Sequence, residues 1–353
     1  IINIEIKSRE FISRMMIAYE ALKREYDIVT GAQDQLLEIL FNLPKGIYLE
    51  KSISKNKLKI LKKIKKHGHK IVNLDEEGMA SQNNSHFFLK QRLSKETLDL
   101  TEYFFNWGNN EKKLLQNKYF DSKDKFKTTG NPRIDSWKPK YSKLYKNEIE
   151  YINNKYENFI FITSNFASIQ HARGSDFLKQ QASDYRKIET VQDEEILNSK
   201  RVFMKKVYSS FLDMIKKLSL ELPNNIIVLR PHPADDIDQW KKKLMNYKNV
   251  YIEYEFSATP WIISCKCMIH SSCTTGMEGF FSNTPVFSYL PYKDHSSVNY
   301  ISNTLSDICL NYFELIKKVK SVLGERYNRD YKKIDVLKDK SIIENIDESN
   351  SAK

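Results

Sequence analysis

Apolar residues in the first half of the chain switch repeatedly between the two-residue period of strands and the longer period of helices. Ile2, Ile4 and Ile6 alternate with polar residues, and helical spacing follows directly, with Ser8 placed as the helix N-cap. Further short apolar runs of the strand type occur downstream, at 26–31, 46–51, 69–74, 101–108 and 124–130. Strands that alternate with helices in this way predict a parallel sheet.

A second series of the same kind begins at 158–168, a continuous apolar run that opens onto a small polar loop. A helical stripe then leads to the strand that ends at Arg230, and three more runs of the strand type follow, at 250–254, 266–270 and 284–290. The pattern predicts an α/β protein with two Rossmann-like domains whose parallel sheets face each other across a cleft. We expect an N-terminal domain at 1–138, a linker at 139–158, a C-terminal domain at 159–310 and a basic helical tail at 311–353.

Composition narrows the class of partner. The chain has 353 residues, a size that suits two domains, and its formal net charge of +12 favours an anionic partner. Nucleic acid is disfavoured, because the lysines are scattered through helical segments and no nucleic-acid-binding signature is present. Four cysteines, no signal peptide and no long apolar run predict a reducing, cytoplasmic setting.

Three acids, Asp75, Glu76 and Glu77, directly follow the strand at 69–74 and precede Gly78. Neighbouring carboxylates repel one another, which raises the pKa of at least one of them toward the range of a general base. Acids after a strand also often cap the next helix or face water. Spacing alone slightly favours this second interpretation.

The strand at 226–230 ends on Arg230-Pro231-His232-Pro233. The two prolines alone indicate a turn. An arginine and a histidine held beside them are also two cationic donors that can converge on one anion, at the strand end where open α/β sheets bind ligands.

A third strand ends at His270, and Ser271 and Ser272 follow it before a short predicted helix. The first N–H groups of that helix and the serine hydroxyls are suitable donors for a phosphate. Glu278 lies farther along the helix, where its carboxylate can accept the two hydroxyls of a ribose. Each Ser or Thr taken singly is equally consistent with an ordinary N-cap.

Together these groups predict a nucleotide site without a Walker loop or a GxGxxG fingerprint. Cations and a helix end would stabilise a departing phosphate, while the acids of the other domain would act as a base. This division of roles suits glycosyl transfer, in which negative charge develops on the leaving phosphate.

The ordered set Glu76-Glu77-Gly78, His232-Pro233 and Ser271-Ser272 resembles the motifs of bacterial sialyltransferases and related CMP-sugar transferases with the GT-B fold. Four longer strings are similar to bacterial surface carbohydrate biosynthesis proteins, relatives of the capsule Kdo transferases: NLDEEGM, TGNPRID, LRPHPADD and IHSSCTTGMEGFFSNTPVFSY. The likeness spans roughly residues 2–291.

The resemblance implies a CMP-activated acidic sugar donor, either Kdo or a nonulosonic acid, and an oligosaccharide or lipid-linked glycan acceptor. It implies Glu76 as the base, with Glu77 and Asp75 as alternatives, and His232 as the group that hydrogen-bonds or protonates the CMP phosphate. The remaining residues expected at the donor are Arg230, Pro233, Ser271, Ser272, Thr274, Glu278, Asn165 and Gly130.

No metal or other cofactor is expected. Asp236 and Asp238 form a DxD pattern, but they follow the His-Pro pair at a predicted helix start, where acids favour the helix dipole. Cys265, Cys267 and Cys273 lack paired C-x-x-C spacing, so we expect buried free thiols rather than a zinc site.

Two other functions share part of this pattern. The first is a CDP-glycerol or ribitol phosphotransferase of the teichoic-acid type, which the RPHP and serine half of the chain also resembles. The second is a catalytically silent subunit of a capsule complex that binds a nucleotide sugar. The basic surface further predicts peripheral contact with the inner face of the inner membrane.

Overall fold

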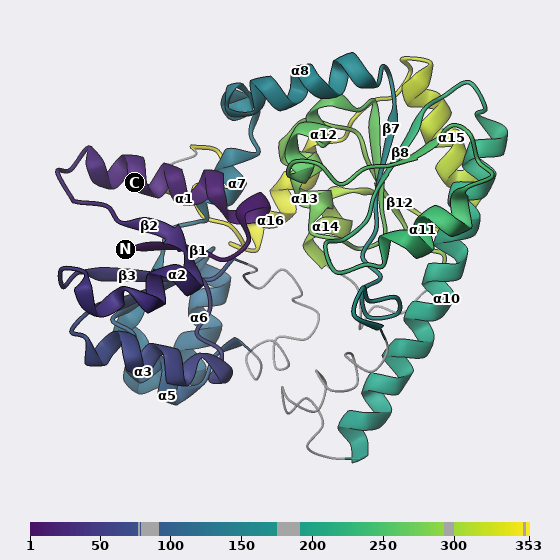
Figure 1. Cartoon of the computed structure of the whole chain (residues 1–353). Helices are drawn as coiled ribbons and strands as arrows, with labels where there is room; N and C mark the ends of the chain where they lie inside the picture. Colours follow the sequence, from purple (N-terminus) through teal and green to yellow (C-terminus); the bar gives the residue numbers. More distant parts are fainter. Residues whose placement is uncertain (77, 79–91, 175–190, 293–299, 349–350) are drawn as a thin grey trace. The chain divides into compact units, whose positions relative to one another are not determined.

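A computed structural model describes residues 1–76, 78, 92–174, 191–292, 300–348 and 351–353, which form two compact units (Figure 1). Unit 1 consists of Ile1–Tyr141 with Tyr331–Lys353, and unit 2 of Ser142–Asp330. Most of the predicted linker therefore belongs to unit 2, including α8 (Lys146–Lys155). The predicted tail is divided between the units, because α15 (Tyr312–Leu323) packs in unit 2 before the chain returns to unit 1.

Unit 1 contains a six-stranded parallel sheet in the order β2-β1-β3-β4-β5-β6, as the alternating pattern predicts. The strand predicted at 26–31 is shorter in the structure and begins only at Thr30, ending at Ala32. The strands are β1 (Ile2–Ile4), β2 (Thr30–Ala32), β3 (Ile47–Glu50), β4 (Lys70–Leu74), β5 (Tyr103–Asn106) and β6 (Phe126–Thr128).

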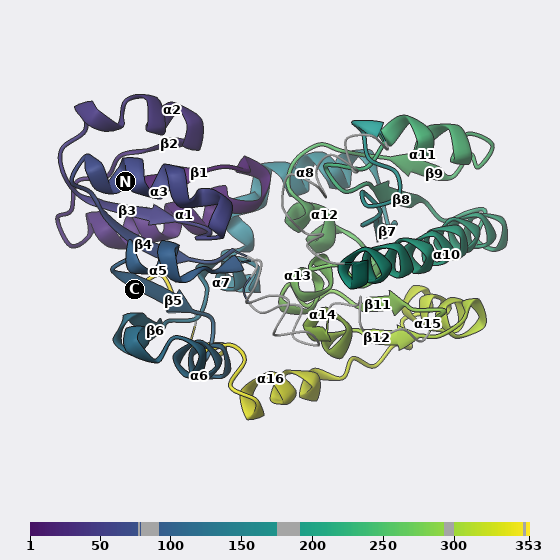
Figure 2. The same ribbon diagram turned by 90° about the horizontal axis from the view of Figure 1, so that it is seen from below.

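Helices cover both faces of this sheet because successive strand residues point to opposite sides. Helices α1 (Lys7–Leu22) and α3 (Leu58–Lys66) lie on opposite faces (Figures 1 and 2). Leu49 and Val72 pack toward α1, whereas Tyr48 and Ile71 pack toward α3. Further helices of this unit are α2 (Gln33–Glu38), α5 (Lys95–Asp99), α6 (Asn109–Lys118) and α7 (Pro132–Ser136).

The prediction of Ser8 as an N-cap is wrong. Helix α1 begins at Lys7, one residue before Ser8, and its N-cap residue Ile6 makes no side-chain cap. The carboxylate of Glu10 instead accepts the backbone N–H of Glu5 at 2.8 Å, so an acid in the first turn satisfies a donor that precedes the helix.

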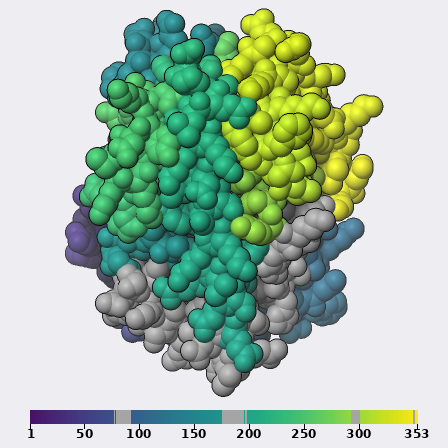
Figure 3. All heavy atoms as spheres, turned by 90° about the vertical axis from the view of Figure 1, so that its right-hand side faces the viewer, coloured from purple at the N-terminus to yellow at the C-terminus, as the bar shows by residue number. Residues whose placement is uncertain are grey.

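Unit 2 has a second six-stranded parallel sheet, in the order β12-β11-β10-β7-β8-β9. Helix α10 (Val191–Glu221) covers one face together with α15 (Figure 3), and its predicted apolar stripe is buried. The strands are β7 (Ile160–Thr163), β8 (Ile227–Arg230), β9 (Val250–Ile252), β10 (Cys267–His270), β11 (Val286–Tyr289) and β12 (Asp307–Cys309). The remaining helices are α11 (Ile237–Leu244), α12 (Ala258–Ser264), α13 (Thr275–Phe281) and α14 (Tyr300–Leu305).

The last residues of the chain complete unit 1. Helix α16 (Asp335–Asp339) buries Leu337, and the following backbone pairs with the segment after β5, where the N–H of Glu344 donates to the carbonyl of Trp107 at 2.6 Å. Gly108 permits this approach, because a Cβ there would lie 2.4 Å from the carbonyl oxygen of Ile342. Among the described residues, no helix is long and apolar enough to cross a bilayer.

We predict that Leu337→Ala lowers the free energy of unfolding of unit 1 by about 2–4 kcal/mol, because it leaves a cavity beneath a fully buried side chain. Chemical denaturation followed by circular dichroism measures this loss. Leu22→Ala, at a half-exposed leucine of the same unit, is the control. Equal losses in the two variants would show that the terminal segment does not belong to the core of unit 1.

Candidate functional site

Three adjacent strands of unit 2 end beside the residues predicted to bind the donor. His270 of β10 pairs with Thr163 of β7, and Thr163 pairs with Arg230 of β8, so the three strands end in register. Asn165, His232 and Ser271 each follow one of these strand ends within two residues. The topology therefore brings three segments that are far apart in sequence to one edge of the sheet.

A buried carboxylate, Asp235, holds two of these loops together. It accepts the hydroxyl of Ser164 at 2.5 Å, the N–H of Phe166 at 3.1 Å and the indole N–H of Trp240 at 3.2 Å. Burial raises the pKa of Asp235, and these three hydrogen bonds oppose that shift. No sequence motif marked Asp235, the first of the two acids in the string PADD; the second, Asp236, lies at the helix start.

His232 is oriented by the same loop. Its backbone N–H donates to the hydroxyl of Ser164 at 3.2 Å, and its Nδ1 accepts the N–H of Ala234 at 3.1 Å. A neutral ring with this contact carries its proton on Nε2, which makes Nε2 a hydrogen-bond donor. The ring is half-buried, whereas Pro233 is exposed.

Arg230 stabilises the loop that follows β9. Its guanidinium donates to the carbonyl of Glu255 at 2.8 Å and to that of Phe256 at 2.5 Å, and it lies 5.3 Å from the centre of the Tyr254 ring. Burial lowers the pKa of Arg230, while the negative charge of Glu278 opposes that shift. Contact between Arg230 and a phosphate stays a prediction.

The serine loop has an unusual backbone. Ser272 has φ of 57°, in the left-handed region that residues other than glycine seldom adopt, and its hydroxyl accepts from the side-chain amide of Asn303 at 3.1 Å. A conformation of this kind costs about 1–3 kcal/mol and persists only where its surroundings impose it. Asn303 is held in turn by the hydroxyl of Ser288, which donates to it at 2.7 Å.

His270 supports this loop from below. The ring is fully buried, and burial lowers its pKa to about 3, so it is neutral. Nδ1 accepts the N–H of Cys273 at 3.1 Å, and Nε2 lies 2.8 Å from the hydroxyl of Ser306. Gly276 permits the ring to pack beneath α13, because a Cβ there would lie 2.5 Å from Nε2.

Helix α13 is joined to β7 and α12 by hydroxyl groups. Thr275 and Thr163 share a hydrogen bond of 2.8 Å, and Thr259 donates to the carboxylate of Glu278 at 3.4 Å. Thr274 directly precedes the helix and makes no side-chain cap. Glu278 is buried, and the roles predicted for Glu278 and Thr274 at the donor stay predictions.

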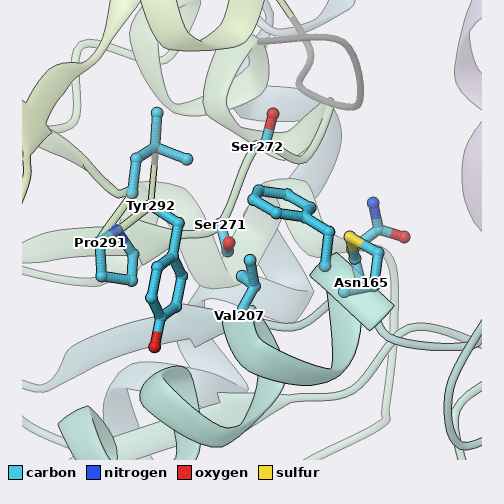
Figure 4. A pocket seen from close by; sticks show the side chains of 9 residues that line it. Asn165, Val207, Ser271, Ser272, Pro291 and Tyr292 are labelled. Carbon is cyan, nitrogen blue, oxygen red and sulfur yellow. The ribbon is translucent and has the colours of Figure 1, made fainter. Parts of the chain in front are cut away.

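Three of the residues predicted to bind the donor line one pocket of unit 2 (Figure 4): Asn165, Ser271 and Ser272. Apolar side chains form the rest of its wall, from α10 and from the segment after β11. They are Phe203, Met204, Val207, Leu290, Pro291 and Tyr292. The pocket thus combines a few polar groups with an apolar wall, as small-molecule sites commonly do.

In unit 1, Asp75 and Glu76 follow β4, and the two carboxylates have different surroundings; Glu77 lies outside the described residues. Asp75 forms a bidentate ion pair with Arg92, with distances of 2.8 and 3.2 Å, and accepts the N–H of Gly78 at 2.9 Å. Its oxygens are therefore engaged in holding the loop, which favours Glu76 as the candidate base.

Glu76 is buried beside α1. Its Oε1 lies 3.1 Å from a guanidinium nitrogen of Arg14, and its Oε2 has no hydrogen-bond partner among the described residues. Burial raises the pKa of Glu76, while the charges of Arg14 and Arg133 oppose that shift. Arg14 was missed in the sequence, where its only signal is a charge within the apolar stripe of α1.

The predicted Gly-Asn-Pro turn is bound to the same loop. Asn131 donates from its amide to the carbonyl of Asp75 at 3.3 Å, and Arg133 donates to the carbonyl of Glu76 at 3.4 Å. Gly130 has φ of 76°, and a Cβ there would lie 2.5 Å from the carbonyl oxygen of Glu344. The structure thus places Gly130 against the terminal segment of unit 1, and its contact with a donor stays a prediction.

The acids and cysteines whose spacing resembles a metal site have other roles in the structure. Asp236 and Asp238 lie at the start of α11, as predicted, and Asp236 caps the helix by accepting the N–H of Gln239 at 3.1 Å. Cys265, Cys267 and Cys273 are free thiols, and burial raises the pKa of Cys267 to about 12. Within the described ranges, no group of three His, Cys, Asp or Glu side chains could hold a metal ion.

Solved structures similar to this chain share its two-domain architecture. UDP-GlcNAc 2-epimerase from Neisseria meningitidis, bound to UDP-GlcNAc, has a TM-score of 0.57 at 12% identity, over 99% of this chain and 95% of that one. The wall teichoic acid polymerase TagF has a TM-score of 0.57 at 13% identity, over 99% and 85%. MnaA from S. aureus, solved with UDP, has a TM-score of 0.56 at 12% identity, over 99% and 93%.

No protein-family model matches the sequence, and no curated protein matches it. At this level of identity the likeness establishes the fold alone. The predicted α/β fold of the GT-B type, with two Rossmann-like units, is confirmed.

A pH dependence of stability follows from Glu111, a buried residue of α6 that no sequence pattern marked. Its carboxylate accepts the N–H of Trp107 at 2.9 Å, and burial, reinforced by the charge of Asp75, raises its pKa to about 7 from 4.5. The folded state therefore retains this proton where the unfolded state has lost it. The resulting stabilisation is complete below pH 4.5 and is lost as the pH rises through about 7.

We predict that Glu111→Gln removes this component, which amounts to about 3 kcal/mol at most. Denaturation measured at intervals between pH 5 and pH 8 should show the advantage of the wild type over the variant shrinking as pH rises. Glu38→Gln, at an exposed glutamate of the same unit, should leave the profile unchanged. A constant difference between wild type and Glu111→Gln would mean that Glu111 is ionised throughout.

Proposed function

We propose that the protein is a metal-independent glycosyltransferase that moves an acidic sugar, Kdo or a nonulosonic acid, from a CMP-sugar to a surface polysaccharide or glycolipid acceptor. The observation that carries this proposal is the joining of three strand-end loops in unit 2. Through Ser164, Asp235 and Thr163, the segments that contain Asn165, His232 and Ser271 are linked at one edge of the sheet.

The donors at this edge suit a phosphate that gains charge as the glycosidic bond breaks. His232 has its Nδ1 engaged with the backbone, so the proton on Nε2 is the one that can reach a phosphate oxygen. Ser271 and Ser272 line the pocket of unit 2, and His232 follows the end of β8 at the same edge of the sheet. A monophosphate leaving group served by such donors has little need of a cation, because fixed dipoles stabilise the developing charge.

Glu76 is the group best suited to remove the proton from the acceptor hydroxyl. Its raised pKa makes it a stronger base than an exposed carboxylate, and Asp75 is engaged with Arg92. The net reaction forms a bond between the acceptor oxygen and the anomeric carbon and breaks the bond from that carbon to the CMP phosphate oxygen. The acceptor proton passes to Glu76.

The choice of CMP rests on the ordered acid, His-Pro and serine motifs rather than on the fold. The fold is shared with MnaA solved with UDP, with a UDP-GlcNAc 2-epimerase bound to UDP-GlcNAc, and with TagF, one structure of which was soaked with CDPG. The likeness to TagF keeps CDP-linked phosphotransfer as the second candidate, because the same His and Ser groups of unit 2 would serve either donor.

We predict that CMP binds to unit 2 and that His232→Ala weakens this binding about tenfold or more, since a hydrogen bond to a charged group contributes about 1.5–3 kcal/mol. Isothermal titration with CMP, CDP and UDP measures the affinities. His67→Ala, at a histidine of unit 1, is the control and should leave them unchanged. A preference for CDP would favour the phosphotransferase, and a preference for UDP would contradict both readings.

We also predict that Glu76→Gln reduces sugar transfer about a hundredfold or more, the usual contribution of a general base, while the affinity for CMP is retained. Asp75→Asn should instead lower the free energy of unfolding by about 3 kcal/mol, because it removes the buried charge that pairs with the Arg92 guanidinium. Transfer from a panel of CMP-sugars, alongside denaturation, separates the two effects. Full transfer activity in Glu76→Gln would remove Glu76 from the mechanism.

A further inference from the structure

A long stretch of unit 1 is basic without interruption. Residues 51–74 contain nine lysines and no acid, and they include the whole of α3. Charge runs of this kind act on a partner only if the side chains are exposed together on one surface, which depends on how the helix packs.

Helix α3 presents its lysines on one side. Leu61 and Ile64 are fully buried against the sheet, as the apolar stripe predicts. Four lysines are spaced at i, i+3, i+4 and i+7, which places them on the opposite face of the helix. They are Lys59, Lys62, Lys63 and Lys66, and all four are exposed or half-exposed.

Exposed apolar side chains lie beside this row. Phe41 is 65% exposed and Ile39 45% exposed, in the turn that follows α2. The ammonium group of Lys63 donates to the carbonyl of Leu37 at 3.0 Å, and the Phe41 ring lies 6.3 Å from the ring of His67, centre to centre. These contacts tie the turn to the C-terminal end of α3.

The apolar turn and the C-terminal end of the lysine row lie toward the amino ends of the sheet strands. Helix α3 leads into the start of β4, where Lys70 pairs with Ile47, the half-exposed first residue of β3. Asp75 and Glu76 follow the opposite, carboxyl end of β4. A partner bound at the amino ends would therefore lie at the end of β4 opposite to the candidate base.

We propose that this surface, formed by Ile39, Phe41, Ile47, Lys59, Lys62, Lys63 and Lys66 and here called the α3 surface, docks the protein on an anionic lipid bilayer. Lysines near an anionic membrane each contribute about 1 kcal/mol, and the long lysine side chains keep their charge at the headgroups while apolar neighbours enter the interface. Exposed phenylalanine and isoleucine have no role in binding a phosphate backbone, which favours a bilayer over a nucleic acid.

This inference does not depend on the proposed function, since it concerns a surface separate from the donor pocket. Its test is sedimentation of the whole protein with vesicles of phosphatidylglycerol and phosphatidylcholine in equal parts, and with phosphatidylcholine alone. We expect binding to the anionic vesicles, little binding to the neutral ones, and a steep loss of binding as salt is raised.

The triple variant Lys59→Glu, Lys62→Glu and Lys66→Glu should weaken vesicle binding about tenfold or more, and Phe41→Ser should weaken it several-fold at unchanged charge. The matched control is Lys241→Glu, Lys242→Glu and Lys248→Glu, an equal change of charge at exposed lysines of unit 2. Denaturation and CMP titration of each variant report folding and the donor site separately.

An equal loss in the control triple would show general attraction of a basic protein and overturn the assignment to the α3 surface. Tighter binding of single-stranded RNA than of anionic vesicles, lost in the α3 triple variant, would assign the surface to nucleic acid instead. Absence of binding to anionic vesicles at low salt would overturn the proposal outright.

Discussion

The candidate donor site depends on one buried carboxylate, that of Asp235. It joins the loop after β7 to the loop after β8 by accepting three hydrogen bonds, from Ser164, Phe166 and Trp240. A buried carboxylate is tolerated only when its lone pairs accept hydrogen bonds. The loss of any one of these three donors would therefore leave part of the Asp235 charge buried and unsatisfied. This junction sets the positions of Asn165 and His232. Asn165 lies between Ser164 and Phe166, which both donate to Asp235, and His232 precedes Asp235 by three residues.

Unit 1 uses buried charge in a different way. Asp75 and Arg92 neutralise each other and hold the start of the loop. The next residue, Glu76, faces the Arg14 guanidinium with one oxygen, and its other oxygen has no hydrogen bond to any residue that the structure describes. Burial raises the pKa of a carboxyl and a nearby cation lowers it, so the balance between the two sets its proton affinity. Two adjacent acids thereby acquire different chemistry, one structural and one suited to proton transfer.

Strain and support are paired at the serine loop. Ser272 adopts a left-handed conformation, and the side chains around it, Asn303 on one side and buried neutral His270 on the other, hold the loop in place. Rigid support of this kind keeps donors fixed before a ligand arrives, which is the condition for strong electrostatic stabilisation of a charge that develops during a reaction. The closely packed Gly276 belongs to the same arrangement.

The sequence by itself determined the alternation of strands and helices, the two parallel sheets, the apolar stripe of α10 and the helix start at Asp236, because each of these is a local periodic or short-range signal. It also pointed to three residues that line the pocket, since strand ends are recognisable from composition. Only the tertiary structure decided that Asp235, Arg14, Glu111 and His270 are buried supports, that Arg230 binds backbone carbonyls, and that the terminal segment completes unit 1. The physical reason is that burial and hydrogen-bond partners depend on residues distant in sequence, which no local pattern records.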